Sequence, residues 1–411
     1  MTAAAPARLR VAAAWATVGN TAWAGAQWLT VWALARFTGA AALGDYAYVL
    51  ATVVPVFALT NLQLRELLAT DARGAHDVST YLRVRWMGCA AGTMLVALVL
   101  ALLGRPVPLA LAGLVIATKV LEGVAELRVA QAQRAERWML VAGALGARGV
   151  AVGLAAIVTA ATTRDSRATV LAVCLAQVIV LLGIERRLPR RLGAMAGTSP
   201  APAADAQGLV LGALPLGIAA VLNAGYTNLP RLALGRLVGS AALGGYAAAS
   251  TLLVPIGLLA GVVAAVAGPR LAGALARDDL VTARRLLGAI TGAALFAGAA
   301  LVLLVVWCGA FATQVAFGDR FPGIEEVLVP LAVATAASVV GGVLGVAVTA
   351  GRILRPQLWV HIGATICLAV GCAIFIPPGG AVGAAWAQAL GAGCATLGFA
   401  ALALSLLRRR P

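Results

Sequence analysis

The sequence predicts an all-α polytopic membrane protein with about twelve transmembrane helices in two parallel six-helix bundles. Three observations support this fold class: an apolar composition, apolar runs of similar length separated by arginines, and an internal duplication. Of the 411 residues, 62% are hydrophobic and 11% are charged. A soluble domain carries about 25% charged residues because its surface faces water. The composition therefore excludes a soluble globular protein, and it also excludes a disordered chain.

Composition also constrains the partners. The net charge is +16, from 31 basic and 15 acidic residues. The basic residues, which are arginines except for Lys119, are spread in small groups between apolar runs. Because they form no single patch, nucleic acid is not an expected partner. The 6 cysteines lie inside apolar runs without the spacing of a metal site or a disulfide framework.

Membrane-spanning helices need about 20 largely apolar residues. Twelve segments meet this length, at 11–35, 45–69, 82–104, 107–130, 138–161, 168–185, 209–235, 244–269, 285–309, 326–350, 357–377 and 381–407. The first run is too long for a signal-peptide core, so we assign it to the first span. The lipid bilayer is the expected surroundings of the whole chain.

Arginine placement predicts the orientation. Loops on one side of the predicted membrane hold 22 basic residues and loops on the other side hold 6. Since cytoplasmic loops carry the excess of Lys and Arg, both termini are expected in the cytoplasm. The longest connection is rich in Arg, Ala and Pro, which predicts an N-terminal bundle at 1–188, a cytoplasmic linker at 189–207 and a C-terminal bundle at 208–411.

An internal duplication supports the two bundles. Residues 36–59 align without gaps with 236–259 and share 11 of 24 positions. Six spans separate the copies, so the halves have the same orientation and are related by an axis along the membrane normal. Two such bundles are expected to flank a central cleft, as in an alternating-access carrier. Pro55 and Pro255 are equivalent helix-interior prolines, and each is either a hinge or a static kink.

Charged residues inside a membrane span are costly, so each marks a function or an internal pair. The fourth span carries Lys119, Glu122 and Glu126 at spacings that share one helical face. Arg148 in the fifth span is the expected companion of this face. These charges contact a substrate or a coupling ion, or they only neutralise one another. Further candidates for substrate binding or ion coupling are Arg231 and Asn228 in the seventh span, and Arg65, which can also reach the headgroups.

Motifs for catalysis, nucleotide binding and metal binding are not found in the sequence, and the predicted loops are short. We therefore expect no enzymatic activity, no catalytic residue, no metal and no cofactor. Arginines on an inward face suit a phosphate or pyrophosphate, which they bind by bidentate hydrogen bonds. The carboxylates suit a coupling H⁺ or Na⁺.

Several motifs resemble Wzx-type polysaccharide flippases. The first is Arg36-x-x-Gly39-x-x-x-Leu43-Gly44-x-Tyr46 with Pro55, followed by the segment 62–71, Leu-Gln-Leu-Arg-Glu-Leu-Leu-Ala-Thr-Asp. The others are Lys119-x-x-Glu122, Gln133-x-x-Glu136-Arg137 and Arg148-Gly149. These flippases belong to the MOP exporter superfamily, together with MATE-type multidrug exporters and lipid II flippases. The likeness covers the twelve-span plan, and its local signals concentrate in residues 36–150 and 236–255.

The resemblance implies a flippase that moves an undecaprenyl-pyrophosphate-linked oligosaccharide across the bacterial inner membrane by alternating access, for O-antigen lipopolysaccharide, capsule or exopolysaccharide. The partners implied are this lipid-linked substrate, a polysaccharide polymerase and chain-length proteins. The second half carries few intramembrane charges, so the contacts with substrate or coupling ion are expected in the first half. A cation-coupled MATE-like exporter of small molecules is the alternative within the same fold, and a non-transporting membrane enzyme or assembly factor is the alternative outside it.

Overall fold

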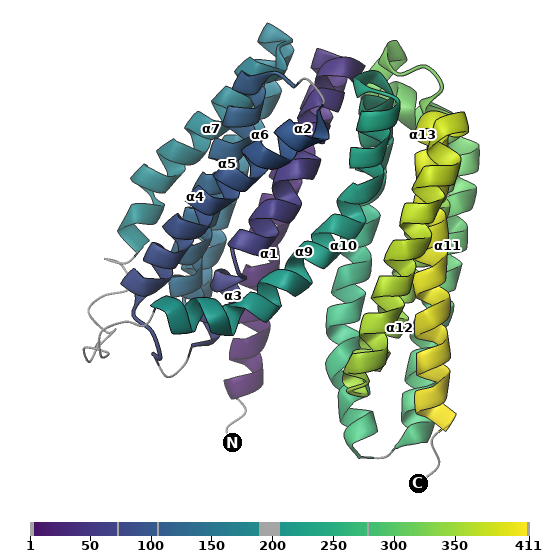
Figure 1. The fold of residues 1–411 in the computed structure, drawn as a ribbon. Helices are drawn as coiled ribbons and strands as arrows, with labels where there is room; N and C mark the ends of the chain where they lie inside the picture. The colour runs from purple at the N-terminus through teal and green to yellow at the C-terminus, as the bar shows by residue number, and fades with distance from the viewer. Residues whose placement is uncertain (1–3, 72–73, 105–106, 189–205, 278, 409–411) are drawn as a thin grey trace. The chain divides into compact units, whose positions relative to one another are not determined.

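The structure is a computed structural model that describes residues 4–71, 74–104, 107–188, 206–277 and 279–408. Within these ranges the regular secondary structure is entirely helical (Figure 1). The first part contains α1 (Ala4–Thr38), α2 (Ala40–Thr60), α3 (Leu64–Thr70), α4 (Val78–Leu103), α5 (Leu109–Arg134), α6 (Trp138–Thr163), α7 (Ser166–Gly183) and the 3-10 helix η1 (Glu185–Arg187). The second part contains α9 (Ala206–Leu237), α10 (Ser240–Ala276), α11 (Leu280–Phe317), the 3-10 helix η2 (Gly318–Arg320), α12 (Ile324–Ala350) and α13 (Leu354–Arg408).

The predicted spans lie in helical structure, with the second divided between α2 and α3, which confirms the all-α polytopic fold class. The last two predicted spans share α13, which is interrupted at Gly380, where φ is 53°. Nine helical segments in the described ranges are long and apolar enough to cross a membrane. Both α1 and α5 fall outside that set, although α5 has 26 residues and reaches about 39 Å at 1.5 Å per residue. Polar side chains in these two helices account for the difference.

The chain divides by its internal contacts into two compact units. Unit 1 contains Met1–Thr38 and Asp45–Asn228, and unit 2 contains Gly39–Gly44 and Leu229–Pro411. The division therefore lies inside α9 and at the start of α2. The predicted linker at 189–207 lies outside the described residues except for its last two, which begin α9.

Close packing of α1 against α6 organises unit 1. A Cβ atom at Gly149 would lie 2.6 Å from the carbonyl oxygen of Ala22, and one at Gly19 would lie 2.9 Å from the Cα of Ala142. Both distances are shorter than ordinary carbon contacts, so these glycines let the two backbones touch. Small buried residues such as Ala26 and Ala156 continue the same seam. The consequence is that side chains next to Gly149 are held against α1.

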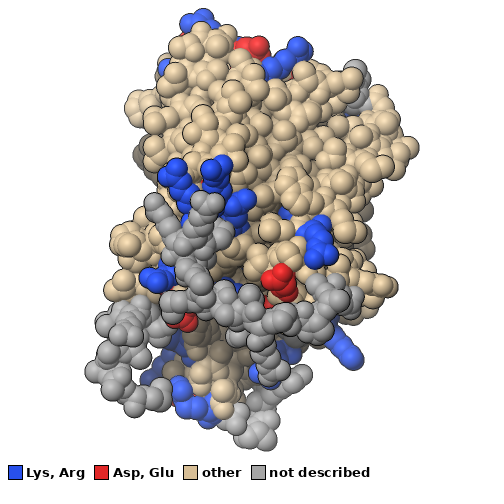
Figure 2. Space-filling model, turned by 90° about the vertical axis from the view of Figure 1, so that its left-hand side faces the viewer, with Lys and Arg blue, Asp and Glu red and all other residues tan. Residues whose placement is uncertain are grey.

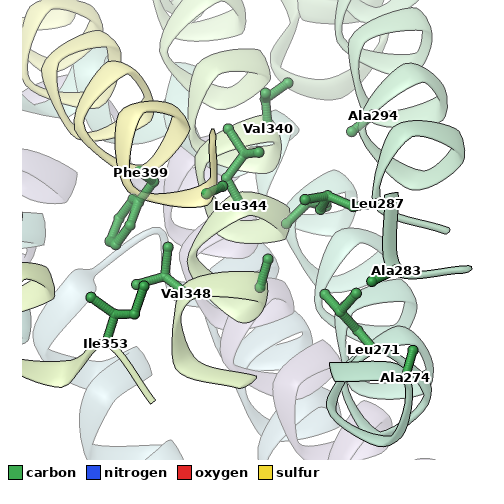
Figure 3. Packing of buried hydrophobic residues seen from close by; sticks show 13 residues of the cluster. Leu271, Ala274, Ala283, Leu287, Ala294, Val340, Leu344, Val348, Ile353 and Phe399 are labelled. Carbon is green, nitrogen blue, oxygen red and sulfur yellow. The ribbon is translucent and has the colours of Figure 1, made fainter. Parts of the chain in front are cut away.

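Unit 2 has an aliphatic core (Figure 3). Leu271 of α10, Leu287 of α11, Val340 and Leu344 of α12, and Phe399 of α13 are all buried in one cluster. The 13 buried members of this cluster are all hydrophobic. Such packing stabilises the four helices against one another.

The duplicated segments meet inside unit 2. A Cβ atom at Gly44 would collide with the backbone of Ser240, and a Cβ atom at Gly244 would collide with the backbone of Ala40. These two glycines are equivalent in the duplication, and so are Ala40 and Ser240. Each copy therefore supplies a glycine that receives the first turn of the other copy's helix, which is a reciprocal contact.

One expectation about the second span needs correction. The sequence predicts a continuous helix over 45–69, whereas α2 ends at Thr60 and α3 starts at Leu64. Leu62 and Gln63 take left-handed backbone angles, with φ of 51° and 48°. In the second copy, α10 continues without such a break to Ala276, past Pro255. The break is thus a feature of the first half alone, and it separates Pro55 in α2 from Arg65 in α3.

Charged side chains avoid a broad zone on the face shown in Figure 2. There, a belt of uncharged residues separates charged groups, and Lys and Arg predominate over Asp and Glu. This distribution is typical of a helical membrane protein, whose lipid-facing surface is apolar.

Candidate functional site

An intramembrane polar cluster lies in unit 1, where α5 meets α2, α3 and α4. Lys119 and Glu122 of α5 form an ion pair in which Nζ donates to Oε2 at 2.6 Å. Their side chains are 19% and 15% exposed. The two residues are three positions apart on the same helix, about one turn, so α5 itself brings the two groups together. Each charge has its counter-ion at hydrogen-bond distance.

The next pair along α5 is looser. An Nη atom of Arg85, from α4, lies 3.8 Å from Oε2 of Glu126, which is beyond hydrogen-bond distance. Arg85 is 1% exposed, whereas Glu126 is 36% exposed. Both Nε and Nη1 of Arg85 are buried without a hydrogen-bond partner. A buried guanidinium with free donors is unusual, because burying such a group without partners is costly.

The groups around Arg85 come from the break in the second span. A Cβ atom at Gly123 would lie 3.4 Å from Cδ and Nη1 of Arg85 and 3.6 Å from Oδ1 of Asn61. The Oδ1 atom of Asn61 is also buried without a donor. Gly123 on α5 thus lies next to both the guanidinium and the amide oxygen. An unpaired donor set and an unpaired acceptor therefore both lie within 4 Å of the Cβ position of this glycine.

Further charges surround Glu126. Arg65 and Glu66 of α3 interact electrostatically with it, as does Glu122 from the previous turn of α5. At the other end of the cluster, Tyr46 of α2 interacts with Lys119. The structure therefore brings together four of the predicted candidates, namely Lys119, Glu122, Glu126 and Arg65. It adds Arg85 and Asn61 to them.

Arg148 lies in a separate cluster. Its Nε donates to Oε1 of Glu185 at 2.9 Å, and its Nη2 donates to the same oxygen. The guanidinium carbon lies 5.2 Å from the ring centroid of Trp23 on α1. Exposed fractions are 2% for Arg148 and 0% for Glu185. The sequence suggests the carboxylates of the fourth span as the companions of Arg148. The structure instead pairs Arg148 with Glu185 of η1.

The position of Arg148 follows from the seam between α1 and α6. It precedes Gly149, whose contact with Ala22 brings Trp23 next to the guanidinium. Glu185 follows the end of α7, at the last turn of unit 1 before the predicted linker. The pair therefore joins α1, α6 and η1. Because its guanidinium is already bonded to Glu185, Arg148 serves as a structural contact in this conformation.

The two remaining candidates lie on α9. Asn228 is buried, and its amide donates to the carbonyl of Ala224 at 2.8 Å. Arg231, three residues on, donates to Oγ of Ser250 on α10 at 3.4 Å. Within the described ranges no carboxylate is recorded at ion-pair distance from Arg231, so its charge is matched only by a hydroxyl.

The first helix of each copy also exposes polar side chains. On α1, Thr17, Asn20 and Gln27 are exposed, and on α9 so are Asn223 and Thr227. Thr17 and Asn20 satisfy part of their hydrogen-bonding groups on their own helix. Polar side chains on a spanning helix are costly in lipid, so these stripes are expected to face water.

Two charged residues of these clusters, Arg85 and Glu185, are not among the candidates that the sequence predicts. Arg85 lies in the first turn of the span predicted at 82–104 and is for that reason counted with the loop arginines, whereas α4 begins at Val78 and places it about two turns inside the helix, where it is buried. The signal for the earlier start is Asp77, whose carboxylate accepts from the Val78 amide at 2.9 Å and from the Ser79 hydroxyl at 2.6 Å. Glu185 is a single carboxylate directly before Arg186 and Arg187, and nothing in the sequence separates it from them.

Comparisons with solved structures identify the fold. The lipid II flippase MurJ in an inward closed conformation aligns with a TM-score of 0.65 at 11% identity, covering 95% of this chain and 91% of MurJ. An inward-facing MATE family transporter of the MOP superfamily gives 0.63 at 14% identity, with 95% and 94% covered. A MOP superfamily transporter from Pyrococcus furiosus, reported with a binding pocket of reverse polarity, gives 0.56 at 14%, with 98% and 96% covered.

No protein-family model and no curated protein matches the sequence. The structural likenesses, at such low identity, establish the fold, and nearly the whole length of each chain takes part in it. The chain is therefore a multi-pass, all-α membrane protein with the fold of the MOP superfamily, as the sequence predicts.

Proposed function

We propose that this protein is a flippase that moves an undecaprenyl-pyrophosphate-linked oligosaccharide across the bacterial inner membrane by alternating access, for surface polysaccharide synthesis. The proposal rests on Arg85, whose Nε and Nη1 donors have no hydrogen-bond partner and which lies beside the partly exposed carboxylate of Glu126. These residues belong to a fold shared with a lipid II flippase. A pyrophosphate is a dense anion, and guanidinium groups bind phosphate oxygens in pairs.

Two incompletely paired arginines, Arg85 and Arg231, favour an anionic substrate. Lys119 and Arg65 lie in the same cluster as Arg85, and Arg231 on α9 lacks a carboxylate partner among the described residues. The exposed polar stripes of α1 and α9 offer hydrogen bonds to the sugars. In this proposal the hydrocarbon chain of the substrate stays in the bilayer while the headgroup passes through a polar path. Pro55 and Pro255 remain the hinge candidates of the two copies.

Roles of the candidates differ under this proposal. In unit 1, Arg85 and Lys119 attract the pyrophosphate, while Glu122 and Glu126 balance the charge of the empty site or carry a coupling H⁺ or Na⁺. In unit 2, Arg231 is a separate candidate for contact with the substrate. Arg148 acts indirectly, by holding α1 and α6 in place. Both termini are cytoplasmic, and a polymerase and chain-length proteins use the product on the other side of the membrane.

One test uses purified protein in vesicles that contain a fluorescent undecaprenyl-pyrophosphate-linked oligosaccharide. A membrane-impermeant quencher reports the fraction of headgroups in the outer leaflet. The wild type is expected to make nearly all headgroups accessible, and Arg85→Gln is expected to slow this exchange at least tenfold. The control is Glu325→Gln, which changes an exposed carboxylate in the first turn of α12. Exchange by the wild type no faster than in empty vesicles contradicts the proposal.

The partly exposed carboxylate of Glu126 favours one second candidate, a cation-coupled exporter of small molecules. An exporter of this kind binds cationic compounds at an acidic group. Deletion of the gene separates the two candidates. Accumulation of lipid-linked oligosaccharide on the cytoplasmic side supports the flippase, and unchanged lipids with reduced dye efflux support the exporter.

A further inference from the structure

Two buried arginines in unit 1 differ in how completely they are paired. Arg148 makes two hydrogen bonds to Glu185 and contacts the ring of Trp23. Arg85 makes none to Glu126, since the shortest distance between them is 3.8 Å. The charge of Arg148 is therefore neutralised by direct hydrogen bonds, whereas the charge of Arg85 is balanced only by a carboxylate beyond hydrogen-bond distance. An incoming anion has more to gain at Arg85.

Glu126 is the group that can change this compensation. It is 36% exposed, so a proton from water can reach its carboxylate without unfolding α5. Glu122, the next carboxylate on α5, is 15% exposed and accepts from Lys119 at 2.6 Å. A proton on Glu122 breaks a short ion pair, while a proton on Glu126 breaks no hydrogen bond that the structure records. Glu126 is thus the carboxylate of the cluster best suited to exchange a proton.

Charges facing Glu126 balance when every group is ionised. The facing titratable groups are Arg65 and Glu66 of α3, Arg85 and Cys89 of α4, and Glu122 with its partner Lys119 on α5. Three cations then face three carboxylates, counting Glu126 itself. A proton on Glu126 leaves one positive charge in excess, and the nearest recorded cation is Arg85.

We infer that protonation of Glu126 and binding of a phosphate-type anion at Arg85 are linked, so that each promotes the other. This inference rests on the proposed function for the identity of the anion, which is the pyrophosphate headgroup. The Nε and Nη1 donors of Arg85 and the Oδ1 acceptor of Asn61 are buried without partners in this conformation. When the transport cycle opens the cluster, the two donors bind the anion, and Asn61 accepts a hydrogen bond from a protonated phosphate oxygen or from water. Because linkage is reciprocal, anion binding takes up a proton and a lower pH strengthens anion binding.

Sodium fits this site less well than a proton. A cation at Glu126 lies next to the guanidinium of Arg85, which repels it, whereas a proton removes the negative charge without adding a separate ion. The linked ion of this site is therefore a proton.

Inorganic pyrophosphate is the probe for the test, titrated into purified protein in lipid nanodiscs by calorimetry between pH 5.5 and about 8. One linked proton makes the affinity of the wild type rise with falling pH by up to about tenfold per pH unit more than that of Glu126→Gln. Comparison with this variant cancels the titration of pyrophosphate itself. Glu325→Gln is expected to follow the wild type. Arg85→Gln is expected to lose binding, and Arg85→Lys to weaken it.

Equal pH slopes for the wild type and Glu126→Gln overturn the inference, and so does undiminished binding by Arg85→Gln. Absence of pyrophosphate binding to the wild type at every pH overturns it as well. The vesicle assay keeps the proposed function separate. If headgroups exchange but the pH slopes are equal, the proposed flippase function is supported and the linkage is refuted. If pyrophosphate binding is linked to the proton but headgroups do not exchange, the linkage is supported and the flippase function is refuted.

Discussion

Removing one member of the Arg148–Glu185 pair is expected to destabilise unit 1 severely. Both side chains are at least 98% buried, and the remaining charge would have no partner at hydrogen-bond distance. Breaking a buried pair costs about 3–5 kcal/mol, and the lost contact of Arg148 with Trp23 adds up to about 2 kcal/mol. For a unit of this size each kcal/mol lowers the melting temperature by about 2–4 °C. Arg148→Met alone should therefore melt roughly 6–28 °C below the wild type, and Glu185→Leu alone, which keeps Arg148, roughly 6–20 °C below it.

The double variant Arg148→Met/Glu185→Leu is the informative comparison. Replacing both charges by apolar groups of similar size is often neutral, so most of the lost stability should return. Melting is measured by fluorescence-detected size-exclusion chromatography after heating, and headgroup exchange is measured in vesicles. A stable and active double variant assigns Arg148 to the packing of α1, α6 and η1. Single variants that melt like the wild type refute the reasoning, and a stable double variant without exchange returns Arg148 to the substrate site.

Three smaller changes test the local geometry. Gly149→Ala places a Cβ atom against the carbonyl of Ala22 and should lower stability by about 1–3 kcal/mol, whereas Gly146→Ala on the same helix meets nothing within 4 Å and should be neutral; equal melting of the two contradicts the seam. Gln63→Gly suits the left-handed turn and should be tolerated, while Gln63→Val should cost about 1 kcal/mol, and the reverse order of melting contradicts the break. Asp77→Ala should cost about 1 kcal/mol at neutral pH. The Ser79 hydroxyl and the Val78 amide lower the pKa of Asp77, so this cost should vanish as the pH falls through that pKa, and a cost that persists in acid contradicts the cap.

Helix positions were predictable because run length and arginine placement report directly on the membrane. The break at Leu62 and Gln63 was not predictable, since neither residue type favours left-handed angles. Nothing in the local sequence separates this segment from a continuous helix. Tertiary contacts decide it: Leu62, Leu64 and Leu68 are buried together with Leu127 of α5.

Candidate residues on a single helix were found from spacing, because Lys119 and Glu122 are one turn apart on α5. Pairs between helices were not found. Arg148 and Glu185 are 37 residues apart, and a sequence gives no rotation of α6 relative to η1. Arg85 was missed for another reason, since the start of α4 four residues earlier moves it from the end of the predicted span to a buried position about two turns inside the helix. The roles of all these residues in transport remain predictions.

The assignment of residues up to Asn228 to unit 1 bears on how the protein is made. Leu209 and Ala213, from the first turns of α9, are buried in the same cluster as Leu68 and Tyr81. A nascent chain with only six inserted helices therefore leaves this apolar surface uncovered until the seventh emerges from the ribosome. Duplication of an ancestral six-helix gene would have required the older protein to cover that surface with a second copy of itself.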